Sequence, residues 1–175
     1  RELIALLPDN APADPRALLR DWNGHADGDS AAALLFEVWL SGYLRPALVS
    51  RVAPQNALRQ LLLPGDIPTV VRLLQGAHPK VAKRAGLDSD AARCDLMTST
   101  LQAAWDTTCA QFGVDCAKWR WDALHQGYFN HAIASFDVGP FPTSGSNTTV
   151  MMAHYEAADY RVRTGASVRM VIDVG

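Results

Sequence analysis

Hydrophobic and polar positions follow helical spacing over the first two thirds of the chain. The clearest stretch begins near Asp88 and Ser89 and ends at Gly113. Within it, residues recur in steps of three and four: Cys94, Met97, Leu101, Trp105, Thr108 and Phe112. This spacing places the side chains on one stripe of a helix, and a glycine is a common C-terminal stop. We predict a long core helix with no binding role.

Shorter helices are predicted before this one. Asp14 is followed by proline and fits a helix start, and Ser30 is a suitable cap for a longer apolar helix. Pro46 should kink or end that helix. Prolines and glycines then divide residues 54–86 into short helices and turns.

The pattern changes after about residue 136. Residues 139–147 are rich in glycine, proline and serine, which predicts a loop. Period-two alternation follows in residues 149–155 and again in residues 167–174, with a turn at Thr164 and Gly165. The second run places four apolar side chains on one face of a strand: Val168, Met170, Ile172 and Val174.

These patterns predict an α+β fold. Residues 1–135 form its mainly helical part, and residues 136–175 form a loop and strands. Two strands alone are marginally stable in water and need a larger sheet. The chain also opens within a helical pattern and stops within a strand-like one, so we expect one incomplete domain of a longer protein.

Composition excludes several classes of protein. The 175 residues include 49% hydrophobic and only 19% charged side chains, which suffices for a substantial core and argues against disorder. With 16 Lys and Arg against 18 Asp and Glu, the chain offers no basic face for nucleic acid. No uninterrupted apolar run reaches the roughly 18–20 residues that span a bilayer, so we expect no membrane partner.

The residues alone indicate no catalytic or metal site. Residues 21–29 have the acidic spacing of a calcium loop, but Ala26 and Ala32 stand where that loop needs glycine and glutamate. A turn and helix cap is the simpler interpretation. Ser144 and Ser146 flank Gly145 without the pattern of a serine hydrolase. The five histidines lack zinc-site spacing, which favours surface or hydrogen-bonded core roles: His25, His78, His125, His131 and His154.

The cysteines and a tryptophan pair leave alternatives open. Cys109 and Cys116 lie on either side of Gly113, a spacing that allows a disulfide in an exported protein, whereas Cys94 is expected to stay a buried thiol. Three cysteines do not establish the compartment. Residues 119–121 (WRW) form either a cation–π surface or, as is more common for alternating large apolar residues, an anchor to the core.

Four phrases of the sequence, in order, resemble the penicillin acylase family. Residues 19–39 (LRDWNGHADGDSAAALLFEVW) resemble the family phrase L-x-x-W-D-G-x-x-x-x-D-S-x-A-A. Residues 119–125 (WRWDALH), with His131 beyond, resemble W-x-W-G-x-L-H. The other two resemblances are at residues 139–150 (G-P-x-P-x-x-G…T-V) and 165–175 (G-A-S-x-R-M-V-x-D-x-G). Asn23 and Asp122 depart from the usual Asp and Gly.

The resemblance implies an N-terminal nucleophile hydrolase that is made as a precursor, cuts itself into α and β chains and is exported to the periplasm or secreted. Its nucleophile is the first residue of the β chain, normally serine, with its own amino group as base and an asparagine at the oxyanion. Arg1 is not that nucleophile, and no residue here matches the asparagine or the family's structural calcium ligands. We therefore expect no catalytic residue, metal or cofactor in this chain.

The resemblance places this chain late in the β chain, as scaffold that helps complete an αββα sandwich. Its partners would be the rest of the β chain and the α chain. The implied activity of the whole protein is hydrolysis of an N-acylated small molecule, such as a β-lactam side chain, an N-acyl homoserine lactone or a lipopeptide. The alternative is a non-catalytic α+β interaction module.

Overall fold

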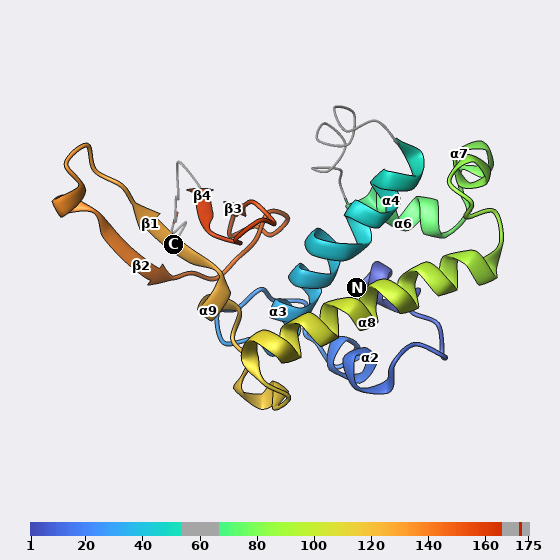
Figure 1. Cartoon of the computed structure of the whole chain (residues 1–175), viewed down its shortest axis with the longest axis horizontal. Helices are drawn as coiled ribbons and strands as arrows, with labels where there is room; N and C mark the ends of the chain where they lie inside the picture. Colours follow the sequence, from blue (N-terminus) through green and yellow to red (C-terminus); the bar gives the residue numbers. More distant parts are fainter. Residues whose placement is uncertain (54–66, 166–171, 173–175) are drawn as a thin grey trace. The chain divides into compact units, whose positions relative to one another are not determined.

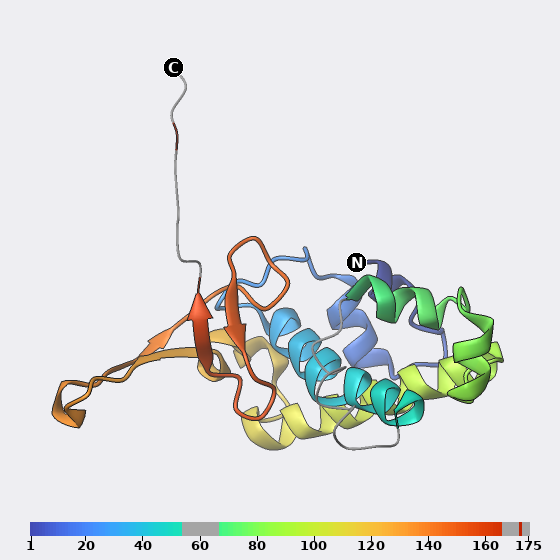
Figure 2. The same ribbon diagram turned by 90° about the horizontal axis from the view of Figure 1, so that it is seen from above.

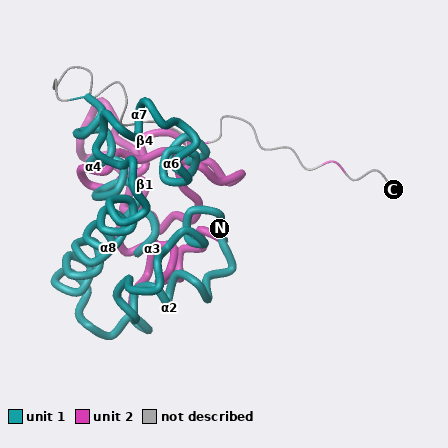
Figure 3. The backbone as a smooth tube through the Cα atoms, turned by 90° about the vertical axis from the view of Figure 1, so that its right-hand side faces the viewer, with its two compact units in different colours: residues 1–24, 35–118 teal, residues 25–34, 119–175 magenta. Residues whose placement is uncertain are grey.

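The computed structural model describes residues 1–53, 67–165 and 172. These residues fall into two compact units, coloured separately in Figure 3. Unit 1 comprises residues 1–24 and 35–118, and unit 2 comprises residues 25–34 and 119–175. Helices dominate unit 1 and a small sheet lies in unit 2, which confirms the predicted α+β class. A single incomplete domain divided at residue 135 stays a prediction.

Unit 1 is built from short helices around one long helix (Figure 1). Its elements are α1 (Glu2–Ala5), α2 (Ala13–Arg20), the end of α3 (Ala31–Glu37), the π-helical η1 (Val38–Leu44), α4 (Arg45–Val52), α6 (Ile67–Leu74), α7 (Pro79–Arg84), α8 (Asp90–Phe112) and the 3₁₀ turn η2 (Cys116–Lys118). Pro79 begins α7, as expected from the N-terminal preference of proline. Part of the region predicted as short helices and turns, residues 54–66, lies outside the described residues.

Helix α8 confirms the long helix predicted from spacing. The Ser89 hydroxyl accepts a hydrogen bond from the Ala92 N–H at 3.2 Å, and Gly113 ends the helix with φ of +84°. The buried face is shifted from the predicted stripe: Leu96, Met97, Thr100, Leu101, Ala104 and Thr108. Small residues on this face allow η1 to pack closely, and the buried Trp39 donates its indole N–H to Thr100 Oγ1 at 3.1 Å.

The helix that begins at Ala31 does not end at Pro46. It changes from α to π over Val38–Leu44 and returns to α at Arg45–Val52. The Arg45 N–H bonds the Leu40 carbonyl, five residues back rather than four. This wider turn lies directly before Pro46, which lacks an N–H and would crowd the preceding turn of an ordinary α-helix. The helix accommodates the proline in this way.

Residues Ala31–Val52 form a helix long and apolar enough, by length and composition, to cross a membrane. However, 67% of its most apolar window is buried within the protein. A buried core helix meets the same criterion, so the finding does not identify a membrane span.

Unit 2 contains a four-stranded sheet with the order β2-β1-β4-β3 (Figure 2). Its elements are α9 (Trp121–Leu124), β1 (Gln126–Phe129), the 3₁₀ turn η3 (Ala134–Phe136), β2 (Val138–Pro142), β3 (Ala153–Tyr155) and β4 (Val162–Gly165). Strands β1 and β2 are antiparallel with Gly127 opposite Phe141, and β3 is antiparallel to β4. Strand β4 runs parallel to β1, with Val162 opposite Gly127.

Several strand boundaries differ from the predictions. Strand β2 occupies part of the predicted loop at residues 139–147, because its prolines are tolerated at a sheet edge. Only the end of the predicted strand at residues 149–155 pairs, as β3. Thr164 and Gly165 belong to β4 and do not form a turn. The described part of this chain therefore supplies its own sheet.

The strand predicted at residues 167–174 lies outside the described residues, apart from Ile172. The Ile172 side chain is 69% exposed in this chain. Burial of its face by other parts of a longer protein stays a prediction.

Candidate functional site

Three distant segments of unit 2 meet in a backbone junction formed by residues 26–28, 121–125 and 143–146. The Gly28 N–H donates to Ser144 Oγ at 2.9 Å, and the Gly28 carbonyl accepts from the Asp122 N–H at 2.8 Å. The Gly145 N–H donates to the Ala26 carbonyl at 2.7 Å. Backbone groups of all three segments are thereby satisfied inside the protein. We call this arrangement the Gly28–Gly145 junction.

The Asp122 side chain approaches Gly28 closely. A Cβ at this position would lie 2.7 Å from Asp122 Oδ2. Asp122 is held there by Arg120, whose Nε and Nη2 donate to its two oxygens at 2.9 and 2.7 Å. The side chain of Asp122 fits because position 28 has none.

Trp121 fixes the centre of the junction. Its side chain is fully buried, and its indole N–H donates to the Gly145 carbonyl at 2.8 Å. The ring stacks on the His125 imidazole with centroids 4.5 Å apart and meets Tyr155 and Tyr160 edge-on. Trp119 is buried as well. The interpretation of residues 119–121 as a core anchor is therefore confirmed.

His125 is a buried imidazole with one ring nitrogen bonded. Its Nδ1 lies 2.9 Å from the Tyr160 carbonyl, which accepts a hydrogen bond, so Nδ1 carries the proton. No hydrogen-bond partner of Nε2 is found among the described residues. Burial lowers the pKa of His125 below its ordinary 6.5, and the bond to Tyr160 opposes this only in part. The core interpretation of this histidine is confirmed, and the ring is neutral at pH 7.

We expect unit 2 to lose stability in acid through His125. Below pH 6.5 the unfolded chain binds a proton that the folded imidazole still excludes. The free energy of unfolding is therefore greatest above pH 6.5 and falls as the pH drops toward the lower pKa of the folded state. The measurement is the urea midpoint of the full-length protein between pH 5 and pH 8.

The matched variant is His125→Asn, whose amide N–H can replace Nδ1–H toward the Tyr160 carbonyl but does not titrate. It should be less stable at pH 8 and show a flatter dependence on pH than the parent. An unchanged pH slope in His125→Asn would contradict this role.

A side-chain clamp closes the loop between the junction and β3. The Asn147 amide donates to the Tyr155 carbonyl at 3.1 Å, and its oxygen accepts from the Tyr155 N–H at 2.7 Å. Next to it, Gly145 has φ of +88°, and a Cβ there would overlap the Met151 carbonyl oxygen. The junction and this loop are therefore closely packed at these positions.

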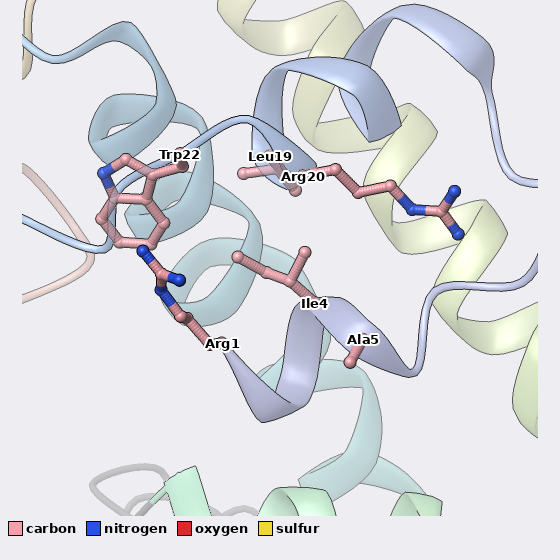
Figure 4. A pocket seen from close by; sticks show the side chains of 6 residues that line it. All are labelled: Arg1, Ile4, Ala5, Leu19, Arg20 and Trp22. Carbon is pink, nitrogen blue, oxygen red and sulfur yellow. The ribbon is translucent and has the colours of Figure 1, made fainter.

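A hollow of about 210 Å³ lies in unit 1 (Figure 4). Its lining consists of Arg1, Ile4, Ala5, Leu19, Arg20 and Trp22. Arg1 donates to the Asn23 carbonyl at 2.8 Å, and Arg20 lies 3.5 Å from the Asp9 carboxylate. None of the six lining side chains is a nucleophile or a general base for acyl transfer at neutral pH. These six side chains therefore supply no acyl-transfer chemistry of their own.

The acidic loop at residues 21–29 behaves as a turn followed by a cap. The Ser30 hydroxyl accepts from the Ala33 N–H at 3.1 Å at the start of α3. Among the described residues, no group of three His, Cys, Asp or Glu side chains is placed to hold a metal ion.

The three cysteines are half-buried free thiols in this structure. Burial, together with Asp106 and Cys116, raises the pKa of the Cys109 thiol. The Cys109–Cys116 disulfide stays a prediction.

Comparison with known proteins gives a family match over the whole chain. The penicillin amidase family model matches residues 1–175. The chain belongs to the penicillin amidase family. A curated relative, an acyl-homoserine lactone acylase from Pseudomonas fluorescens (strain Pf0-1), is 23% identical over 163 residues. The match covers 90% of this chain and 20% of the relative, so the chain spans about a fifth of that protein's length.

Three of the four phrases that resemble the penicillin amidase family meet at the Gly28–Gly145 junction. They supply Gly28, Trp121 and Gly145, respectively, and are held together by the bonds described above. The fourth phrase lies almost wholly outside the described residues. Sequence reasoning missed the stacking of His125 on Trp121. Its only signal was the four-residue spacing within WRWDALH, which brings both side chains to one side of a helical turn.

Proposed function

We propose that this chain is the scaffold part of a larger penicillin-amidase-type hydrolase that cleaves the amide bond of an N-acylated small molecule. The family match over residues 1–175 supports this proposal. The described residues support the scaffold role, because their junction is filled by backbone hydrogen bonds and aromatic rings. Their hollow lacks a nucleophile and a base.

We place the proposed catalytic residues in parts of the longer protein outside residues 1–175. A serine at the start of the β chain would attack the amide carbonyl, and its own α-amino group would take the hydroxyl proton. An asparagine side chain and backbone N–H groups would stabilise the oxyanion. Residues 1–175 would contribute the rigid frame around that site, together with the rest of the β chain and the α chain. An exported precursor, periplasmic or secreted, fits this scheme.

We propose an N-acyl homoserine lactone as the first substrate to test. The Pseudomonas fluorescens relative, an acyl-homoserine lactone acylase that is 23% identical to this chain, supports this choice. β-Lactams with an acyl side chain and lipopeptides contain the same type of amide, so we include them in the same set of test substrates. We propose no metal or cofactor within residues 1–175.

We expect the full-length gene product to release the acyl chain from at least one substrate of this set. The isolated 175-residue chain should release none, because it lacks the nucleophile and the oxyanion donors. Mass spectrometry of the products, with both proteins purified in parallel, is the measurement. Turnover by the isolated chain would contradict the scaffold role. A full-length protein that is inactive on every amide tested would favour the non-catalytic module.

A further inference from the structure

Positive charge is distributed unevenly along the chain. Residues 38–87 contain seven of the 16 Lys and Arg but only one of the 18 Asp and Glu. The rest of the chain has nine Lys and Arg against 17 Asp and Glu, so its formal charge is −8 while that of residues 38–87 is +6. The balanced total, from which we expected no basic face, conceals this difference. Such an asymmetry indicates contact with an anionic partner.

Five cations of this segment are exposed on described helices of unit 1. They are Arg51 on α4, Arg72 on α6, and Lys80, Lys83 and Arg84 on α7. We call these five residues the cationic patch. Helices α4 and α7 contact each other, and a short loop joins α6 to α7 (Figures 1 and 2). The patch therefore gathers cations from three neighbouring helices.

Ion pairing separates the patch from other cations of the chain. Among the described residues, seven Lys and Arg side chains form ion pairs, and all seven lie outside the patch: Arg16, Arg20, Arg93, Lys118, Arg120, Arg161 and Arg163. Glu2 of α1, which contacts α6, and Asp88 after α7 are exposed, but neither pairs with the patch. The described part of this chain therefore does not neutralise the patch.

Helix α7 directs its cations away from the core of unit 1. Lys80, Lys83 and Arg84 are spaced by three and four residues and share one face, while Ala82 on the other side is buried. Val81 beside them is 41% exposed. This face combines the two elements of interfacial membrane binding, namely cations for anionic headgroups and an apolar side chain for the boundary beneath them.

Helix dipoles account for only part of this arrangement. Four of the five patch cations lie in the last turns of their helices, where positive charge is favourable. Lys80 lies in the first turn of α7, where the dipole disfavours a cation. Acidic residues would be equally favourable in the first turns of α4, α6 and α7, yet none is present there. The lack of acids therefore needs another reason.

We propose that the cationic patch binds the surface of a bilayer that contains anionic phospholipid. This inference rests on the export that is part of the proposed function, because an exported protein meets lipid headgroups rather than nucleic acid. The exposed Val81 also favours lipid, since the phosphate backbone of a duplex offers no apolar layer. The contact is peripheral and needs no spanning segment. It departs from the expectation of no membrane partner, which rested on the lack of a long apolar run.

The test is co-sedimentation of the full-length protein with phosphatidylcholine vesicles that either contain or lack phosphatidylglycerol. We expect binding only to the vesicles with phosphatidylglycerol, and release at high salt because salt screens the attraction. The triple variant Lys80→Gln, Lys83→Gln and Arg84→Gln should bind about a hundredfold more weakly, since the attraction to an anionic surface adds up over the cations.

The matched control is the triple variant Arg20→Gln, Lys118→Gln and Arg163→Gln. It removes the same number of charges, but from cations that are already ion-paired. Its binding to vesicles should stay close to that of the parent. No binding of the parent to phosphatidylglycerol, equal binding to phosphatidylcholine alone, retention of duplex DNA in place of vesicles, or equal weakening in the two triple variants would each overturn the proposal.

A second measurement tests the apolar part of the contact. Val81→Asn keeps every charge and should weaken vesicle binding several-fold, because the side chain no longer gains from entering the boundary. Val114→Asn is its control, since Val114 is 84% exposed in the loop after α8. Equal binding by these two variants would overturn the proposal that α7 faces the lipid.

Vesicle binding and amide hydrolysis are measured on the same preparations, which separates this proposal from the proposed function. A protein that binds the vesicles but hydrolyses none of the amides would remove the hydrolase function and leave the membrane contact intact. An active protein that does not bind the vesicles would do the reverse.

Discussion

Gly145→Ala should prevent unit 2 from folding normally. The backbone at Gly145 has φ of +88°, which costs an L-residue about 1 kcal/mol. In addition, the new methyl group would overlap the Met151 carbonyl oxygen, a backbone atom that cannot rotate away. Overpacking of this kind costs about 1–3 kcal/mol or more. We expect a loss of roughly 3 kcal/mol or more, measured as a lower urea midpoint or, if folding fails, as insoluble full-length protein.

Gly113→Ala is the matched control for this variant. Gly113 has nearly the same φ, +84°, but a Cβ there would meet no atom within 4 Å. Its ψ of 168° lies in a region largely confined to glycine, so alanine should cost about 1–3 kcal/mol from the backbone alone, without any overlap of atoms. Similar losses in the two variants would show that the contact between Gly145 and Met151 does not have the importance assigned to it.

Trp121→Ala should destabilise the protein by about 3–5 kcal/mol, the range for deletion of a fully buried large aromatic side chain. Three effects combine at this position. The cavity is large, the stacking on His125 is lost, and the Gly145 carbonyl loses its indole donor. Hydrogen exchange of the full-length protein should show the greatest loss of protection in the segments that Trp121 joins, residues 26–28 and 143–146.

Two variants separate these effects. Trp121→Phe keeps an aromatic ring but removes the N–H, so it should cost less than alanine. Trp105→Ala deletes the same side chain from a half-buried position on α8, where the loss should be smaller and confined to unit 1. If Trp105→Ala costs as much as Trp121→Ala, Trp121 is not the centre of the junction.

Local signals predicted the helices better than the sheet. Ser89 and Gly113 mark the ends of α8 because caps and glycine stops act within a few residues. The π turn before Pro46 was not predictable by the same reasoning. Pro46 indicated a kink or an end, whereas one wider turn before it lets the helix continue.

The sheet and the junction depend on distant pairings. Strand β2 contains two prolines and reads as a loop until its place at the sheet edge is known. The contact of Gly28 with Ser144 joins residues 116 positions apart, which no local pattern reports. The family resemblance indicated which phrases matter, but only the structure brings three of them together.

The two units are interleaved along the chain, and this limits how the protein can be dissected. The sequence passes from unit 1 to unit 2 at residue 25, returns at residue 35 and changes again at residue 119. No single cut therefore separates the two units. A truncation near residue 118 removes most of unit 2 but leaves residues 25–34 without the segments they pack against. Chimeras between family members should exchange residues 25–34 and 119–175 as a pair. Recombination at one breakpoint would combine a Gly28 loop from one parent with an Asp122 loop from the other.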